Sequence, residues 1–170
     1  MKYEAAQIKK LIPEKLEELG AKFFIAGGAV TSTIMGLAVN DLDIYPKDKL
    51  SMLKLLTFME DNSTLSSVTD KSVLGNHSDT DINVVYLNTY PTANSIFEAF
   101  DFTIVMAAYD SETEKIECHP DYLYDLAKRR IKFNTGTKYP LVSLLRVDKY
   151  TKRGFTISRA EFIKIATEVT

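Results

Sequence analysis

Residues 23–45 read FFIAGGAVTSTIMGLAVNDLDIY, and this stretch carries the clearest indication of the fold. The apolar run 23–26 has the length of a buried strand, and a pair of glycines follows it. Residues 29–35 have the small and apolar side chains of a short helix packed on a sheet, and a further glycine is placed to stop that helix. Residues 39–45 then predict a second strand. The stretch therefore predicts the order strand, glycine turn, short helix, strand.

Two acidic residues lie on the second of these predicted strands. Asp41 and Asp43 are two positions apart, and because side chains alternate along a strand, both carboxylates point to the same face. Paired carboxylates are costly unless a cation lies between them, and oxygen ligands suit magnesium or manganese. Gly27 and Gly28 open the neighbouring helix, whose free N–H groups can hold a phosphate. A phosphate site beside a two-carboxylate metal site is what phosphoryl or nucleotidyl transfer requires.

The same residues resemble those of the polymerase-beta-type nucleotidyltransferase superfamily, and most closely the head domain of CCA-adding enzymes and bacterial poly(A) polymerases. The shared pattern comprises Gly27-Gly28, Gly36 and Asp41-Leu42-Asp43. The chain departs from it at Thr31 and Ser32, where that branch usually has Arg-Asp and the arginine contacts the triphosphate. The resemblance implies that the glycine pair and the hydroxyl of Thr31 or Ser32 bind the nucleotide.

A third acid, Asp101, interrupts residues 100–109, which otherwise predict an apolar strand. Burying a carboxylate in such a strand is expensive without a partner, and a metal ion shared with the first two acids would supply one. The segment that begins at Asp101 also resembles the Arg-Asp-Phe-Thr-Ile-Asn-Ala block of the CCA-adding branch, although it lacks the arginines and the asparagine of that block. In the wider superfamily a third carboxylate from a neighbouring strand completes the metal site. The resemblance thus implies that two magnesium ions are held by Asp41, Asp43 and Asp101.

Two alternatives to this assignment stay open. Asp101 is also compatible with a strand edge in water. In addition, Asp79 and Asp81 form a second Asp-x-Asp at the entrance of the predicted strand 81–87, and Asp81 would reach the metal site under a different strand order. Solvation in a loop is the simpler interpretation of this second pair, because no glycine-rich phosphate loop precedes it.

The most basic segment follows the matching region. Residues 141–152 predict a helix with Leu141, Leu144, Leu145 and Val147 facing inward. Basic side chains interleaved with an aromatic ring can hold phosphates and stack a base. The candidate contacts to phosphates or to an acceptor are Arg130, Arg146, Lys149, Tyr150 and Arg153. The alternative is an ordinary solvated helix face with Tyr150 half buried.

The fold class that follows is α+β, with a mixed, mostly antiparallel sheet covered by helices on one face and a short C-terminal helical appendage. The other predicted strands cover residues 66–74 and 115–119, with a turn at Gly75-Asn76. The other predicted helices cover residues 4–19, 50–60, 92–100, 120–130 and a last segment capped by Ser158. We expect one nucleotidyltransferase-like domain over residues 1–170, with a core at about 20–135 and the appendage at 136–170.

Composition narrows the class of protein further. The 170 residues carry a formal net charge of −2, so any nucleic-acid binding must use a local basic patch. A single cysteine, Cys118, allows no internal disulfide and favours a reducing, cytoplasmic location. No apolar stretch approaches the length of a membrane span, so no membrane partner is expected. The sequence does not indicate an oligomeric state.

The function implied by the resemblance is transfer of a nucleoside monophosphate from an NTP to a hydroxyl, with release of pyrophosphate. Magnesium or manganese, as two ions, would serve as cofactor, and NTP would be the substrate. The acceptor stays open among an RNA end, a small molecule and a protein. The competing interpretations are a catalytically silent nucleotide- or partner-binding module with the same fold, and the toxin half of a toxin–antitoxin pair.

Overall fold

The computed structural model describes residues 1–169, which form two compact units. The first unit contains residues 1–93 and 107–117, and the second contains residues 94–106 and the chain from Cys118 onward. The core expected at about 20–135 is thus distributed over both units, and residues 94–106 belong with the C-terminal helices rather than with the sheet.

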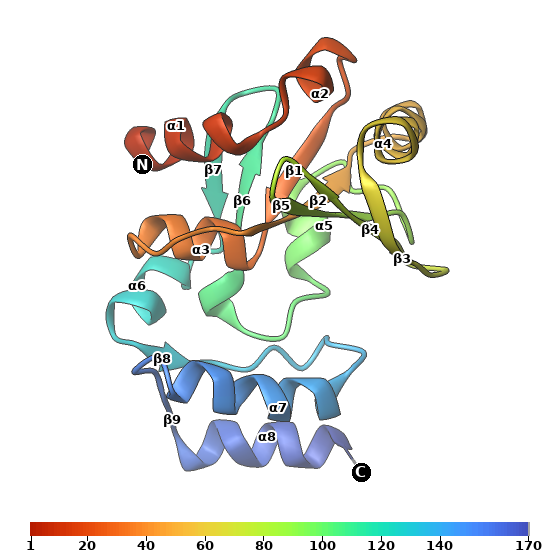
Figure 1. Cartoon of the computed structure of the whole chain (residues 1–170). Helices are drawn as coiled ribbons and strands as arrows, with labels where there is room; N and C mark the ends of the chain where they lie inside the picture. The colour runs from red at the N-terminus through yellow and green to blue at the C-terminus, as the bar shows by residue number, and fades with distance from the viewer. Residues whose placement is uncertain (170) are drawn as a thin grey trace. The chain divides into compact units, whose positions relative to one another are not determined.

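The first unit is built on a seven-stranded sheet with the strand order β3-β4-β5-β2-β1-β6-β7 (Figure 1). Its strands are β1 Phe23–Ala26, β2 Asp41–Pro46, β3 Thr64–Val68, β4 Ser72–His77, β5 Thr80–Val85, β6 Ala107–Asp110 and β7 Lys115–Cys118. Its helices are α1 Lys2–Leu11, α2 Glu14–Glu18, α3 Gly28–Ile34 and α4 Lys49–Asn62. Strand β2 pairs with β5 in parallel, whereas β1 pairs with β2 and β6, and β4 with β3 and β5, in antiparallel. The predicted α+β class with a mixed, mostly antiparallel sheet is confirmed.

The two faces of the sheet differ in what covers them. Leu42 and Ile44 on β2 are fully buried, whereas the alternate residues Asp41 and Asp43 lie on the more open face. Helix α4 packs closely on the covered face. A Cβ added at Gly75 of β4 would lie 2.5 Å from the hydroxyl of Ser63, the residue that directly follows α4. The helices therefore bury the apolar face and leave the acidic face of β2 accessible.

The second unit is mostly helical. It contains α5 Ala93–Phe97, which begins at the end of the first unit, the 3-10 helix η1 Thr103–Val105, α6 Tyr122–Ala127, α7 Pro140–Thr151 and α8 Arg159–Val169. Helices α7 and α8 pack side by side, and the short strands β8 Arg130–Ile131 and β9 Thr156–Ile157 pair in parallel (Figure 1). The Ser158 hydroxyl accepts a hydrogen bond from the Glu161 N–H at 3.1 Å, which confirms the predicted cap of the last helix.

One predicted strand proves to be two. Residues 66–74 were expected to form a single strand, but β3 and β4 are joined by a turn around Thr69, whose hydroxyl accepts bonds from the Lys71 and Ser72 N–H groups. The predicted turn at Gly75-Asn76 is also wrong, because both residues lie within β4. The chain reverses instead at Ser78 and Asp79, which have positive φ angles of 50° and 65°. Gly75 reflects the close approach of α4, and not a turn.

The predicted strand 100–109 is wrong in its first half. Asp101 lies in a bend, Phe102 forms an isolated bridge with Phe133, and η1 follows before β6 begins at Ala107. The backbone of this segment bonds to residues far along the chain, since the Asn134 N–H donates to the Asp101 carbonyl at 2.7 Å. Contacts of this kind leave no periodic signal in the sequence.

Helix α7 forms where it was predicted, but only part of its predicted inward face is buried. Val147 is buried as predicted, whereas Leu141 and Leu145 are 62% and 71% exposed. Ser143 and Tyr150 are buried as well. The inward face is thus selected by polar and aromatic contacts within the second unit, which the apolar pattern alone does not reveal. Among residues 1–169, no helix is long and apolar enough to cross a bilayer.

Candidate functional site

The open face of the sheet brings four polar side chains together around the start of β2. In the parallel pairing of β2 with β5, Asp41 lies opposite Asp81 and Asp43 lies opposite Asn83. Residues directly opposite each other in a ladder share a face of the sheet. The Asn83 Nδ2 donates a hydrogen bond of 3.3 Å to the Asp43 Oδ1. The predicted Asp-x-Asp is therefore held beside a second row of polar residues on β5.

The row that contains Asp41 continues onto a third strand. Asn76 of β4 lies opposite Asp81, and its Nδ2 donates to the Asp81 Oδ1 at 2.9 Å. The companion acid Asp79 lies in the tight turn between β4 and β5 and not on the ladder. The amides Asn76 and Asn83 were not expected from the sequence, because strand register alone brings them to the acids.

The donor set on this face fits a hard divalent cation. Asp41 is exposed and Asp43 half-buried, so both carboxylates are accessible, and oxygen ligands on a partly hydrated site suit Mg²⁺ or Mn²⁺. Throughout residues 1–169, no three acidic, histidine or cysteine side chains are close enough together to bind one ion. A cation bound beside Asp41 and Asp43 would therefore have two carboxylate ligands, and water would supply the others.

The glycine pair lies next to these acids. Ile25 of β1 pairs with Ile44 of β2 in an antiparallel ladder. The next residue of β1 lies just before the glycine turn, and the next residue of β2 in the opposite direction is Asp43. One further step of the ladder therefore places these two residues opposite each other. Gly27 has a φ of 83°, which favours glycine, and its N–H donates to the Ala107 carbonyl at 3.3 Å. A Cβ added at Gly28 would meet nothing within 4 Å, so the backbone there is open to approach.

The two hydroxyls suggested for the nucleotide differ in accessibility. Thr31 is only 4% exposed, within the buried face of α3, whereas Ser32 is partly exposed. Ser32 is therefore the hydroxyl that a phosphate could reach, and Thr31 contributes to the packing of α3.

Asp101 has partners of its own within the second unit. It is 4% exposed, its Oδ1 accepts from the Arg146 Nη1 at 2.6 Å, and its Oδ2 accepts from the Ser143 hydroxyl at 3.1 Å. Burial disfavours the charged guanidinium, but Asp101 and Tyr150 outweigh it and raise the pKa of Arg146. One oxygen of Asp101 is thus in an ion pair with Arg146 and the other accepts from the Ser143 hydroxyl, and its assignment as a third metal ligand stays a prediction.

Arg130 is also paired with a buried acid. Its Nε and Nη2 donate to the Asp125 Oδ1 at 3.1 Å and 2.7 Å, and the Thr103 hydroxyl donates to Oδ2 at 2.6 Å. Asp125 is fully buried, and the hydrogen bond and charge of this carboxylate raise the pKa of Arg130. The positive charge of Arg130 is therefore committed within the fold, and it is a poor candidate for a phosphate contact.

Tyr150 is 3% exposed, so it cannot stack a base as the sequence suggested. Its ring makes edge contacts with Phe102 and Phe155, and it attracts three cations. The centroid lies 5.7 Å from the Arg146 guanidinium carbon, 5.9 Å from the Lys149 Nζ and 5.9 Å from the Arg153 guanidinium carbon. Tyr150 is thus an anchor for cations and not a stacking platform.

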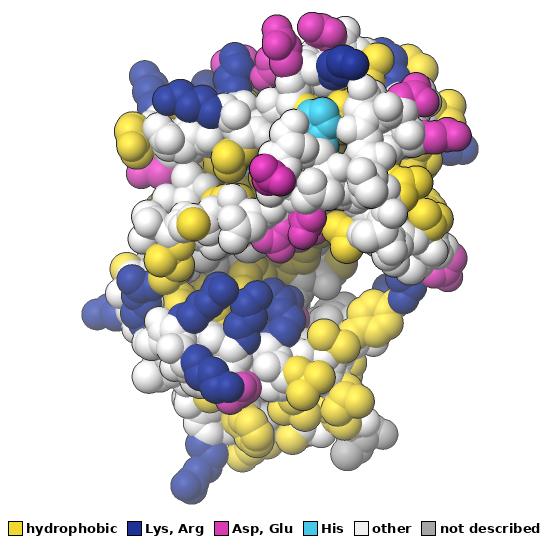
Figure 2. Space-filling view, viewed as in Figure 1, with side chains coloured by type: hydrophobic (Ala, Val, Ile, Leu, Met, Phe, Trp, Pro, Cys, Tyr) yellow, Lys and Arg dark blue, Asp and Glu magenta, His cyan; other side chains and the backbone are white. Residues whose placement is uncertain are grey.

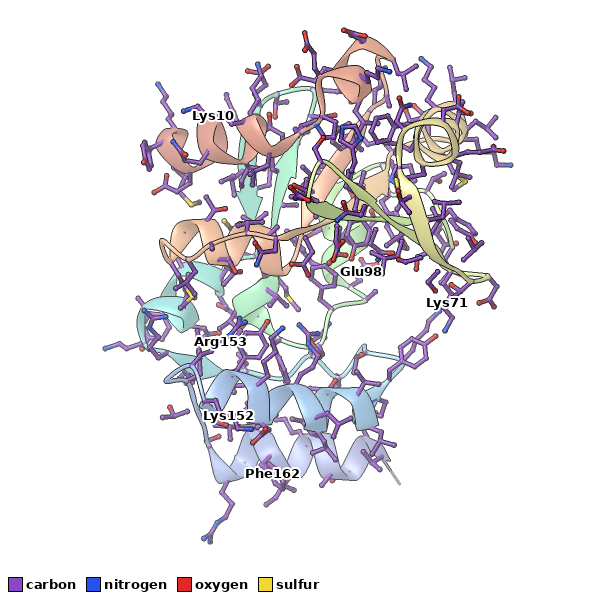
Figure 3. All side chains as sticks on the ribbon, in the orientation of Figure 1. Lys10, Lys71, Glu98, Lys152, Arg153 and Phe162 are labelled. Atoms are coloured by element: carbon purple, nitrogen blue, oxygen red, sulfur yellow. The ribbon has the colours of Figure 1, made fainter. Side chains whose placement is uncertain are left out.

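Lys149 and Arg153 are the available cations of this group. Within residues 1–169 neither forms an ion pair with an acid, whereas Lys152 pairs with Asp148 at 2.7 Å. Arg153 and Lys152 leave the end of α7 on different sides of the helix (Figure 3). Lys and Arg side chains gather on one face of the second unit (Figure 2). That unit has eleven Lys and Arg against seven Asp and Glu, whereas the first unit has ten against sixteen.

Comparison with known proteins identifies both a family and a fold. Residues 2–129 match the model of the family described as Gabija anti-defense 2 family protein. The protein named Gabija anti-defense 2 of Bacillus phage SPbetaL7 is 41% identical over 145 residues, which cover 83% of this chain and 36% of that protein. The chain thus corresponds to about a third of the length of this relative.

Solved structures share the fold at low identity. The Thermotoga maritima CCA-adding enzyme complexed with tRNA matches with a TM-score of 0.71 and 16% identity, over 90% of this chain and 39% of that one. A tRNA nucleotidyltransferase complexed with a primer tRNA and an incoming ATP analogue matches at 0.66 and 18%, over 92% and 49%. A tRNA-processing enzyme with CTP matches at 0.65 and 17%, over 92% and 45%. The chain therefore has a nucleotidyltransferase-like fold.

Proposed function

The chain belongs to the Gabija anti-defense 2 family, and from this membership and its nucleotidyltransferase-like fold we propose that it is a metal-dependent nucleotidyltransferase module. The reaction is transfer of a nucleoside monophosphate from an NTP to a hydroxyl acceptor, with release of pyrophosphate. The observation that carries the proposal is the pair Asp41 and Asp43, presented on the open face of the sheet beside the glycine turn. The anti-defense role stated in the name of the phage relative is the biological role that we propose for the module.

Asp41 and Asp43 would hold the Mg²⁺ or Mn²⁺ ions, for which two carboxylates on one strand face and the neighbouring water provide oxygen ligands. When bound, such ions neutralise charge on the phosphates and orient the reacting oxygens. The binding of two ions stays a prediction, because Asp101 is engaged elsewhere.

The nucleotide would be bound by the residues beside these acids. The Gly27-Gly28 turn leaves its backbone open to a phosphate, and the partly exposed Ser32 hydroxyl would replace part of the arginine contact that the related branch has. The chain would supply orientation here, since the turn follows β1, the strand that pairs with the acid-bearing β2.

The acceptor would be drawn to the basic second unit. Lys149 and Arg153 carry charges that no acid of residues 1–169 pairs with, so they can contact phosphates of an incoming molecule. An RNA end satisfies this requirement directly, and two of the matched structures contain tRNA by name. A phosphorylated small molecule or a protein hydroxyl are the other acceptors consistent with the site.

The direct test is label transfer. The purified chain is incubated with each NTP labelled on the α-phosphate, with Mg²⁺, and with RNA or protein extract from bacterial cells, and the Asp43→Asn variant serves as control. We expect label in one acceptor class with wild type and none with the variant. NTP binding without any transfer would instead support the silent-module alternative, which the engagement of Asp101 by Arg146 favours.

The anti-defense role requires a separate test, because the chain corresponds to only 36% of the length of the phage relative. Cells that carry the Gabija defense are infected with a sensitive phage while they express wild type or Asp43→Asn. Restored plaque formation with wild type alone would link the role to catalysis by this module.

A further inference from the structure

We propose that Asn83 is a positioning residue that orients the Asp43 carboxylate for metal binding. The inference rests on the proposed function, because it concerns the same site. It begins from the ladder between β2 and β5, in which Asn83 lies directly opposite Asp43 and on the same face. The Asn83 Nδ2 donates to the Asp43 Oδ1 at 3.3 Å, and both side chains are half-buried.

An amide is well suited to this position. An ionised carboxylate only accepts hydrogen bonds, so a neutral donor on the neighbouring strand can fix its rotation without competing for the cation. An acid at position 83 would repel Asp43 in the metal-free protein, and an apolar side chain would remove this hydrogen-bond donor. Groups that hydrogen-bond to a metal-binding side chain commonly determine how tightly that side chain binds the metal.

The next row of the sheet supplies a built-in comparison. There the residue opposite Asp41 is an acid, Asp81, and the amide of Asn76 lies one strand further away, on the far side of Asp81. The Asn76 amide thus supports Asp81, whereas the Asn83 amide supports Asp43 directly. If positioning by an amide matters, removal of Asn83 should weaken metal binding, and removal of Asn76 should not.

The experiment compares Asn83→Leu with the matched control Asn76→Leu, which makes the same substitution on the same face of the sheet. The affinity for Mn²⁺ alone is measured by electron paramagnetic resonance, without nucleotide, and thermal melting checks that each variant is folded. We expect Asn83→Leu to weaken Mn²⁺ binding by about 10–100-fold, the usual effect of losing such a supporting group. Asn76→Leu should bind Mn²⁺ as wild type does.

A second variant, Asn83→Val, is used in case Asn83→Leu does not fold, since valine favours strands and also lacks a hydrogen-bond donor. Equal Mn²⁺ affinity in wild type and the folded Asn83 variants would overturn the inference and leave the proposed function intact. A similar loss in Asn76→Leu would overturn it in favour of Asp81 as the acid that matters. If wild type itself bound no Mn²⁺, the proposed function would fail, and the inference with it.

Discussion

Asp101 provides the sharpest test of which acids are structural and which are catalytic. We expect Asp101→Ala to destabilise the fold strongly and to leave metal binding unchanged. The substitution removes a carboxylate that is 4% exposed and accepts from Arg146 at 2.6 Å and from Ser143 at 3.1 Å. It leaves the guanidinium of Arg146 without its acid, inside a group of aromatic rings.

The magnitude follows from what each partner can still contact. Breaking a buried pair by removal of one partner costs about 3–5 kcal/mol. The Arg146 side chain is 34% exposed, so water can solvate part of its charge, and the Ser143 hydroxyl keeps the Tyr139 carbonyl at 3.4 Å. The lower value, about 3 kcal/mol, therefore applies to Asp101→Ala. The reverse change, Arg146→Met, leaves the buried Asp101 carboxylate without its arginine. The loss in free energy of unfolding should therefore lie near the upper value, about 5 kcal/mol.

Urea unfolding followed by far-UV circular dichroism measures these free energies, and a loss of about 3 kcal/mol corresponds to a fall of about 6–12 °C in melting temperature. Mn²⁺ affinity is measured on the same samples. A change below about 1 kcal/mol together with weaker Mn²⁺ binding would refute the reasoning, because the carboxylate would then be a metal ligand and not an ion-pair partner.

Three further predictions concern the site itself. Asp43→Asn should abolish label transfer and leave the melting temperature of the metal-free protein equal or higher, since carboxylate repulsion is relieved; a large fall in melting temperature would show a structural role. Gly28→Val should abolish NTP binding in calorimetry, because the side chain would stand where a phosphate approaches the backbone. Stability should be unchanged, because an added Cβ meets nothing within 4 Å; unchanged NTP affinity would make the glycines a simple turn. Lys149→Glu should weaken binding of a labelled RNA, whereas Lys152→Glu, at a lysine already paired with Asp148, should weaken it less; equal losses would count against a local contact.

The parts of the fold that were predictable from the sequence depend on local signals. The strand of Phe23–Ala26 has the observed bounds, Gly36 follows the short helix with a φ of 71°, and Asp41 and Asp43 lie on one strand face. Each of these follows from residues within a few positions of one another: an apolar run, a glycine that tolerates positive φ, and the alternation of side chains. Such features do not require knowledge of which strands are neighbours.

The parts that were missed depend on contacts across the chain. The segment around Asp101 forms no long strand because it bonds to residues 132–134 and to Arg146, which lie 29 or more positions away. Gly75 lies within a strand because α4 approaches it, and Asn83 joins the site through the register of β2 with β5. A one-residue change of that register would have moved Asn83 to the opposite face, so no single-sequence pattern could have identified it.

The two units carry net charges of opposite sign. The first unit has ten basic and sixteen acidic residues and the second has eleven and seven, so an approaching polyanion is repelled by the first and attracted by the second. Diffusing polyanions would then be steered to the second unit before any specific contact forms. Since the Debye length shortens from about 30 Å at 0.01 M salt to about 8 Å at 0.15 M, this steering should accelerate capture mainly in dilute salt.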